Sequence, residues 1–419
     1  MNEERLYWLG FSVFPGIGPV KFNILLAHYG SAKSAWETAG VPLARRGLAK
    51  LIGTKTAEKF SEFQKDFSVD AYAEKLEKKK VSFLTLADPE YPSLLKQTTK
   101  PPYVLYVKGD LGSIYSSSEV EKLSLSSRAT QVVIPANAGI QMDPHVLPED
   151  DNKITSAPMP RNDTTLIISV VGTRKITQYG RDVTQLITFE LVGQGFTIVS
   201  GLAMGVDAVA HQTAIDNGGK TIAVLGCGVD CCTPEENTYL YDSIIEHGGC
   251  ILSELPLGHP PSMGSFPARN RIVAGLSIGT VVTEGAEDSG ALITADFALQ
   301  YGRKAFAVPG PITSSLSKGP YKLIEKGGKL VTSVQDILNE LKVQNSKLKT
   351  TAQNSKRKES RSSAEEEKIL EILANEPLHF DEIVRRSKMS SSQAGSLLSL
   401  MEVKGIIRSV DGGFFAITS

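Results

Sequence analysis

Six short, almost entirely apolar runs between residues 166 and 308 restrict the fold of this chain more than any other feature. Strands that are apolar on both faces are typical of a parallel sheet covered by helices on each side. The pattern therefore predicts an α/β domain with a Rossmann-like, doubly wound parallel sheet. The predicted strands lie at 166–171, 197–199, 222–225, 251–252, 278–282 and 305–308, and helices are predicted at 178–194, 207–217, 236–247 and 291–301.

The segments on either side of this region follow other patterns. Residues 1–75 have a helical period, and a Pro-Gly-Ile-Gly-Pro turn at 15–19 is typical of helix-hairpin-helix or SAM-like modules. Because Lys21 is the only basic residue near that turn, a helical packing module is favoured over a DNA reader. Residues 364–419 predict three helices and a hairpin, which is a winged-helix pattern. Its recognition helix, predicted at 391–404, has one basic residue, so a protein-binding or regulatory role is as well supported as DNA reading.

Changes in composition mark the boundaries of the predicted domains. The extended Rossmann-like domain is predicted to span 76–340, and it includes a short apolar strand at 103–107. Within it, residues 116–165 are rich in Ser, Pro, Asn and Asp and have no periodic apolar face, so we expect a disordered insertion that the fold does not need. The basic and polar stretch at 341–363 has the composition of a linker.

Overall composition argues against several classes of protein. The 419 residues have a formal net charge of −1, so a nucleic-acid partner would need a local basic pocket. No run reaches the ~18 apolar residues of a membrane span, and the first residues lack a signal-peptide pattern, which predicts a cytoplasmic protein with no membrane contact. No metal site is predicted, because zinc spacing is not found among Cys227, Cys231, Cys232 and Cys250.

Three glycine-containing turns follow predicted strands and are expected to bind an anion. The carboxyl ends of parallel strands share one edge of a sheet, so the amides of these turns are expected to converge there. Arg174 adds charge to the first turn, and the stretch Phe-Pro-Ala-Arg-Asn-Arg-Ile at 266–272 adds two guanidinium groups that suit a phosphate. The residues predicted to bind the anion are Gly172, Thr173, Arg174, Ser200, Gly201, Gly205, Arg269, Asn270, Arg271, Ser289 and Gly290.

Structural and catalytic roles are the alternatives for these residues. Arg269 or Arg271 could instead pair with Glu254 or Glu284 in the same domain. Catalysis is not predicted, because the sequence has no nucleophile elbow, Walker sequence or paired carboxylates. The first turn lacks the Gly-x-Gly-x-x-Gly fingerprint of nicotinamide binding, and no cofactor is predicted. His211 could act as a base, although a histidine one turn into a helix is more often a packing residue.

Taken in order, the motifs of this region resemble those of the DprA/Smf DNA-processing proteins. The similarity runs from 165 to 334 and is weaker over 1–110 and 364–419. The motifs are Val-Gly-Thr-Arg at 171–174, Ser-Gly-Leu-Ala-Met-Gly-Val-Asp at 200–207, Ala-His at 210–211, Gly-Lys-Thr-Ile-Ala-Val-Leu-Gly-Cys-Gly-Val-Asp at 219–230, Phe-Pro-Ala-Arg-Asn-Arg-Ile at 266–272, Ser-Gly-Ala-Leu-Ile-Thr at 289–294, and Gly-Arg at 302–303 with Val-Pro-Gly at 308–310.

This resemblance implies a single-stranded DNA-binding protein that acts as a homodimer in natural transformation. Such a protein protects incoming DNA and loads the RecA recombinase onto it, without catalysis. The resemblance also implies that Arg174 contacts a DNA phosphate and that the dimer contact lies around Tyr321 to Leu330.

The sequence differs from this family at three positions that bear on DNA affinity. Met204 stands at an often basic position, Thr233 stands where tyrosine is usual, and Glu235 stands where some members have a DNA-contacting lysine. These differences imply weaker DNA binding than is usual for the family. Two other functions stay open on the sequence, a nucleoside-monophosphate phosphoribohydrolase with a Rossmann-like fold and a winged-helix transcription regulator. The hydrolases' Pro-Gly-Gly-x-Gly-Thr loop is missing at 283–290, which disfavours the first.

Overall fold

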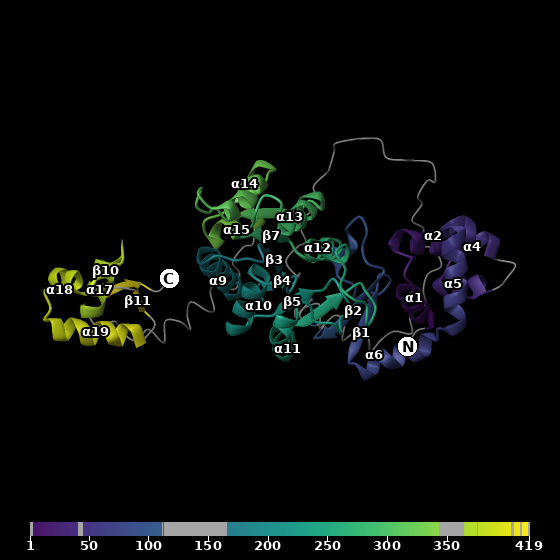
Figure 1. The fold of residues 1–419 in the computed structure, drawn as a ribbon, viewed down its shortest axis with the longest axis horizontal. Coiled ribbons are helices and arrows are strands. Elements are labelled where there is room, and N and C mark those ends of the chain that lie inside the picture. The colour runs from purple at the N-terminus through teal and green to yellow at the C-terminus, as the bar shows by residue number, and fades with distance from the viewer. Residues whose placement is uncertain are drawn as a thin grey trace. The chain divides into compact units, whose positions relative to one another are not determined.

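A computed structural model describes residues 3–40, 45–110, 112, 166–342, 364–374, 376–403, 406–410 and 413–417 (Figure 1). The chain divides into two compact units, 1–342 and 343–419. The insertion predicted at 116–165 and nearly all of the linker predicted at 341–363 lie outside the described residues.

The first part of the larger unit is helical, as the period of residues 1–75 predicts. Aromatic side chains fill the space between these helices, and the rings of Phe11 and Phe60 stack with their centroids 5.0 Å apart. The Pro-Gly turn lies between the first two helices, where the sequence places it. The helices are α1 (Glu3–Val13), α2 (Pro19–Tyr29), α3 (Ala32–Gly40), α4 (Arg45–Ile52), α5 (Thr54–Asp66) and α6 (Val69–Lys78).

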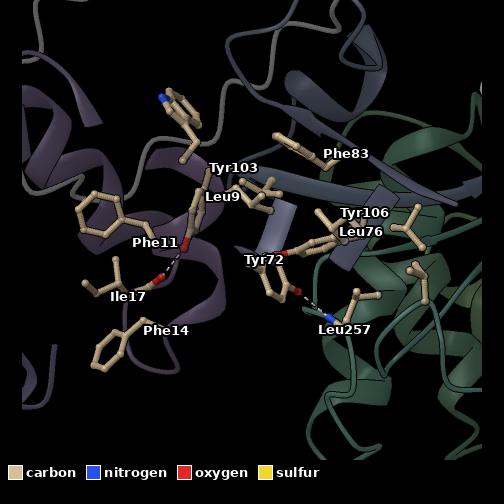
Figure 2. Packing of buried hydrophobic residues seen from close by; sticks show 14 of the residues in the cluster. Leu9, Phe11, Phe14, Ile17, Tyr72, Leu76, Phe83, Tyr103, Tyr106 and Leu257 are labelled. Atoms are coloured by element: carbon tan, nitrogen blue, oxygen red, sulfur yellow. Dashed lines mark hydrogen bonds between the residues drawn. The ribbon is translucent and has the colours of Figure 1, made fainter. Parts of the chain in front are cut away.

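This helical part shares its hydrophobic core with the sheet that follows. The Tyr103 hydroxyl donates to the carbonyl oxygen of Ile17 at 2.8 Å, and the amide of Leu257 donates to the Tyr72 hydroxyl at 2.9 Å (Figure 2). One continuous cluster of buried apolar residues extends from the first helices to the sheet. The predicted domain boundary between residues 75 and 76 lies within α6.

The described strands of the larger unit form one nine-stranded sheet in the order β1-β2-β6-β5-β4-β3-β7-β8-β9. The six predicted strands are confirmed as β3 to β8, and they are parallel to one another, as predicted. The sheet as a whole is mixed, because β2 pairs antiparallel with β6 and β1 pairs antiparallel with β2. The strands are β1 (Val81–Thr85), β2 (Val104–Gly109), β3 (Ile167–Val171), β4 (Thr197–Ser200), β5 (Thr221–Val224), β6 (Cys250–Ser253), β7 (Gly279–Val282), β8 (Lys304–Ala307) and β9 (Lys329–Leu330).

Helices cover both faces of this sheet (Figure 1). On one face α10 packs against α9 and α11, and on the other α13 packs against α12 and α14. The direction of winding reverses between β3 and β7, which makes that boundary the topological switch point of the fold. The helices are α7 (Ser93–Lys96), α9 (Gln178–Gly193), α10 (Val206–Asp216), α11 (Thr238–Glu246), α12 (Ser265–Leu276), α13 (Gly290–Gln300), α14 (Lys318–Glu325) and α15 (Val334–Leu341), with short 3-10 turns η2 (Glu235–Asn237) and η3 (Ser315–Ser317).

The stretch with two arginines is a helix, which the sequence analysis did not predict. Pro267 lies in the first turn of α12, where a proline is tolerated because its missing amide would have no intrahelical partner. Ile272, Val273 and Leu276 on the same helix are buried against the sheet. Helical geometry therefore decides which of the two arginines points inward.

The smaller unit has the winged-helix fold that the sequence predicts. Strands β11 and β12 form the predicted antiparallel hairpin, and β10 pairs with β12 on its other side. Ile369, Ile383 and Leu398 come from the three helices and are buried together. The elements are α17 (Ala364–Leu373), β10 (Leu378–His379), α18 (Phe380–Ser387), α19 (Ser391–Val403), β11 (Ile407–Val410) and β12 (Phe414–Ile417).

Candidate functional site

The three predicted glycine turns meet at the carboxyl edge of the parallel strands. The Thr173 amide, after β3, donates to the carbonyl oxygen of Glu284, after β7, at 2.7 Å. The Val206 amide, at the start of α10, donates to the carbonyl oxygen of Thr173 at 3.1 Å. Backbone hydrogen bonds therefore join the turns after β3, β4 and β7, as the parallel arrangement predicts.

Arg269 lies beneath this edge and is buried, with 6% of its surface exposed. Its Nη1 donates to the carbonyl oxygens of Gly201 and Val224, and its Nη2 lies 3.9 Å from Asp207 Oδ2. These carbonyls stand where β4 and β5 end, so they have no partner in a continuing ladder. One guanidinium thus satisfies two strand ends and neutralises a buried carboxylate.

Asp207 occupies the anion-binding position of the turn after β4. The amides of Gly201 and Ala203 donate to its Oδ2 at 3.2 and 3.3 Å. Burial raises the pKa of the Asp207 carboxyl, and the charge of Arg269 and these amides oppose that shift. The amides that were expected to face an external anion are therefore engaged by a side chain of the protein.

Glu284 plays a comparable part at the start of α9. Its buried carboxylate accepts hydrogen bonds from the Thr177 amide at 3.0 Å and from the Thr177 hydroxyl at 2.7 Å. Thr177 caps α9, since its hydroxyl oxygen also accepts a hydrogen bond from the Gly180 amide. The loop 172–177 is consequently fixed at both ends.

Arg271 projects from α12 toward another part of the structure. It forms an ion pair with Glu254, which confirms one of the structural alternatives, and its Nη1 donates to the carbonyl oxygen of Lys100 at 2.7 Å. Burial raises the pKa of Glu254, and the charge of Arg271 opposes that shift. Arg269, by contrast, pairs with Asp207 and with neither Glu254 nor Glu284.

The smaller predicted site residues serve mainly to join the turns. The Ser200 hydroxyl donates to the carbonyl oxygen of Val170 at 2.7 Å within the core. The Asn270 amide group donates to the carbonyl oxygen of Gly290 at 3.1 Å, which links α12 to α13. Ser289 caps α13 by accepting a hydrogen bond from the Ala291 amide. Gly290 is exposed, whereas Gly172 and Thr173 are half-buried.

Two of the glycines allow close packing of these loops. A Cβ at Gly201 would overlap the guanidinium of Arg269, and one at Gly205 would overlap the carbonyl oxygen of Thr173. Gly205 also has a φ of 80°, in the left-handed region that favours glycine. The sequence predicts that these turns bind an anion, but at these two positions atoms of the protein occupy the space beside the glycine.

Arg174 differs from the other two arginines of the edge, because its side chain is exposed. Its guanidinium lies 5.5 Å from the centroid of the Phe266 ring, a cation–π arrangement. In the described part of the chain it forms no ion pair. Met204, 43% exposed, lies in the turn whose Gly205 contacts the backbone of Arg174.

Two groups of this domain that could support catalysis are buried. Burial lowers the pKa of His211 to about 3, with a further contribution from the charge of Arg269. Its Nδ1 lies 2.6 Å from the Thr221 hydroxyl, as expected for a packing residue. Burial raises the pKa of the Cys227 thiol to about 11. Among the described residues, no group of His, Cys, Asp and Glu could hold a metal ion, and none of the described helices is long and apolar enough to cross a membrane.

The other residues singled out in the sequence lie around this edge or beyond it. Tyr321 lies on α14 and donates its hydroxyl hydrogen to the carbonyl oxygen of Gly310, and Leu330 lies on β9 at the end of the sheet, 47% exposed. Thr233 is half-buried, and Glu235 is exposed in η2.

Three residues of the site were not predicted as site residues from the sequence. Asp207 stands there only within a motif, Glu284 only as a possible arginine partner, and Phe266 only as the first residue of the stretch 266–272. Asp207 lies in the first turn of α10. An acidic residue at that position of a helix can itself bind the free amides at the helix start, so it could have been recognised from the sequence.

Comparison with known proteins shows what this arrangement resembles. The family model described as DNA recombination-mediator protein A matches residues 159–342, and the DprA winged helix domain matches 353–413. Protein Smf of Synechocystis sp. is 35% identical over 340 residues, which cover 81% of this chain and 73% of that protein. DNA processing protein DprA of Bacillus subtilis is 35% identical over 265 residues, which cover 63% of this chain and 73% of that protein.

A solved structure agrees with these matches. The X-ray structure of DNA processing protein A from Streptococcus pneumoniae is 31% identical and covers 81% of this chain and 98% of its own, with a TM-score of 0.59.

Proposed function

Because the chain belongs to the DprA/Smf family of DNA-processing proteins, we propose that it binds single-stranded DNA, protects it, and loads the RecA recombinase onto it during natural transformation. We place this activity in the cytoplasm, where the recombinase acts. The observation that carries the proposal is the state of Arg174, the arginine of the carboxyl edge that is exposed and has no acidic partner in the described structure.

Arg174 has the properties of a phosphate ligand. A guanidinium binds a phosphate with paired, charge-assisted hydrogen bonds when its donors are not already committed. Arg269 and Arg271 both commit donors to carbonyl oxygens and carboxylates of the protein. We therefore assign the principal phosphate contact to Arg174, and the rest of the predicted set to the framework around it.

Apolar side chains beside Arg174 support a single-stranded ligand over a duplex. Phe266 lies next to its guanidinium, and the exposed Met204 lies in the neighbouring turn. Unpaired bases can pack on such side chains, whereas a duplex keeps its bases stacked inside. Helix α19 of the winged-helix unit has no basic residue between Ser391 and Val403, which gives no support to duplex reading.

Binding without catalysis is also part of this proposal. His211, which could have served as a base, stays neutral at physiological pH because burial lowers its pKa to about 3. Burial likewise raises the pKa of the Cys227 thiol to about 11, so it is a poor nucleophile at that pH.

We propose further that the protein is a homodimer through the segment from Tyr321 to Leu330. Support comes from the edge strand β9, whose Leu330 is 47% exposed at the end of the sheet. Leu330→Glu is expected to convert a dimer into a monomer in analytical ultracentrifugation. A wild-type protein that sediments as a monomer at micromolar concentration would remove the dimer from the proposal.

The test of DNA binding uses an unstructured thymidine oligonucleotide and a duplex of equal length at several salt concentrations. Arg174→Ala is expected to weaken binding of the single strand by roughly 1.5–3 kcal/mol and to lower the salt slope by about one. Lys220→Ala is the control, because it removes one exposed positive charge just before β5, at the opposite edge of the sheet. Equal or tighter binding of the duplex would overturn the proposal, as would an Arg174→Ala variant with wild-type affinity.

A further inference from the structure

A buried ion pair lies beneath the proposed DNA site, at the place where β4 and β5 end. The side chains of Arg269 and Asp207 are only 8% and 9% exposed, and Nη2 of the arginine is 3.9 Å from Oδ2 of the aspartate. Arg269 also donates to the carbonyl oxygens of Gly201 and Val224. Breaking a buried pair of this kind leaves an unpaired charge and unsatisfied carbonyls, so its geometry is strongly determined.

The pair fixes the turn 200–205 through backbone amides. Gly201 and Ala203 donate to Asp207 Oδ2 at 3.2 and 3.3 Å, so the carboxylate holds two amides of one turn. An external phosphate would need those same donors. The turn is therefore held in one conformation by the protein's own anion, whether or not a ligand is bound.

The turn in its fixed conformation contacts the backbone that carries Arg174. The Val206 amide donates to the carbonyl oxygen of Thr173 at 3.1 Å, and a Cβ at Gly205 would lie 2.8 Å from the carbonyl oxygen of Arg174. Because there is no space between the two loops, a shift of the turn 200–205 would also move the Arg174 loop. A chain of direct contacts thus leads from the buried pair to the exposed guanidinium.

We propose that Arg269 and Asp207 are positioning residues of the phosphate site, which hold Arg174 in place and do not themselves contact DNA. This inference rests on the proposed function, and it replaces the phosphate contact that the sequence predicts for Arg269. The side chain of Arg269 is only 8% exposed and its guanidinium already donates to two carbonyls, so it has little to offer a ligand.

Asp207→Asn separates positioning from simple electrostatics. Asparagine keeps the size of the side chain but loses the negative charge that pairs with Arg269. If DNA only sensed that charge, its removal would strengthen binding of a polyanion. Positioning predicts the opposite, an affinity for the thymidine oligonucleotide that falls about tenfold, because a displaced ligand group loses much of its contribution. The salt slope is expected to stay at its wild-type value, since the number of phosphate contacts is unchanged.

Arg269→Lys gives an independent measurement of the same pair. Lysine keeps the positive charge, but it cannot reach Asp207 and both carbonyls with a planar group. We expect a similar loss of affinity with an unchanged salt slope. A slope that falls by about one unit, as expected for Arg174→Ala, would identify Arg269 as a phosphate ligand and overturn the inference.

Ser169→Ala is the control for a general loss of stability. It removes a buried hydrogen bond of 2.7 Å from Ser169 to Thr280, which joins β3 to β7 and involves neither Arg269 nor Asp207. All variants are compared well below their melting temperatures, where the protein is folded. The control is expected to melt earlier than wild type and to keep its affinity. If Ser169→Ala weakens DNA binding as much as Asp207→Asn at a similar loss of melting temperature, the effect is one of stability and the inference fails.

Hydrogen–deuterium exchange without DNA tests the pair independently of the proposed function. Asp207→Asn is expected to speed exchange of the Gly201 and Ala203 amides by about tenfold or more, because their acceptor is weakened. Unchanged exchange would overturn the inference, and so would faster exchange with unchanged DNA affinity. A wild-type protein that does not bind the oligonucleotide would instead overturn the proposed function, while the exchange data would still report on the pair.

Discussion

The loop 172–177 and helix α12 both bring arginines to the same edge of the sheet, yet the two regions use them in opposite ways. Arg174 in the loop is exposed and lies against an aromatic ring. Arg269 in the helix is buried among carbonyl oxygens and a carboxylate. The two residue types are identical, so the difference comes from the backbone groups that surround each side chain.

The different surroundings of the two arginines follow from the backbone groups that the carboxyl edge of a parallel sheet leaves without partners. Strands that end there leave carbonyl oxygens without ladder partners, and helices that begin there leave amides without partners. Arg269 satisfies carbonyls after β4 and β5, while Asp207 and Glu284 satisfy amides after β4 and β3. Most charged side chains at such an edge bind unpartnered backbone groups of the protein. Only a charged side chain without such a partner is available to bind a ligand.

The largest expected effect comes from removing the buried arginine. Arg269→Ala leaves Asp207 as an unpaired buried charge and two carbonyls without a donor, and we expect the free energy of unfolding to fall by about 3–5 kcal/mol. Arg174→Ala is expected to change it by less than about 0.5 kcal/mol, because an exposed side chain supports no core. Urea unfolding of both variants measures the difference. Equal losses would break the distinction between the two regions.

An intermediate effect is expected from acidification, through His211. Its folded-state pKa of about 3 lies below its unfolded value, so the unfolded state binds the extra proton as the pH falls. The stability due to neutral His211 is therefore complete above about pH 6.5 and is lost toward pH 3, by about 1.4 kcal/mol per pH unit. Unfolding free energies measured from pH 7 to 4 are expected to depend less on pH in His211→Gln. An identical dependence in both proteins would show that other groups dominate.

The smallest effect is expected from Phe266→Leu, which changes the ring beside the exposed Arg174. Leucine keeps an apolar contact but removes the ring face beside Arg174, so we expect oligonucleotide affinity to fall by about 0.5–1 kcal/mol with the salt slope unchanged. Fluorescence anisotropy at matched salt measures this change. Phe297→Leu on α13 is a matched control, since that ring stacks on Tyr301 instead. A larger loss in the control would show that Phe266 does not act through Arg174.

Sequence alone predicts the strands of the Rossmann-like sheet well, because each run from 166 to 308 is apolar on both faces. It also places the three turns at one edge, since that follows from parallel strands. Helix α12 was not predicted, because Arg269, Asn270 and Arg271 interrupt its apolar period. A two-residue edge strand such as β9 has too short a pattern to detect.

The different contacts of the three arginines were not predictable from local sequence. Whether Arg269 meets the ends of β4 and β5 depends on the order of strands in the sheet, which no short motif specifies. The pairing of Arg271 with Glu254 could only be stated as one of several possibilities. Arg174 was correctly expected to follow β3, and its contact with DNA stays a proposal.

The core shared between the first helices and the sheet has a practical consequence for truncation. Tyr103 and Tyr106 lie on the sheet side of that core and are buried by the helical part, where Tyr103 stacks on Phe22 with centroids 4.2 Å apart. A chain begun at residue 80 would present those rings to water, and we expect it to aggregate when it is expressed. Shortened proteins for biochemistry are better made by removing residues after Lys342, where the larger compact unit ends.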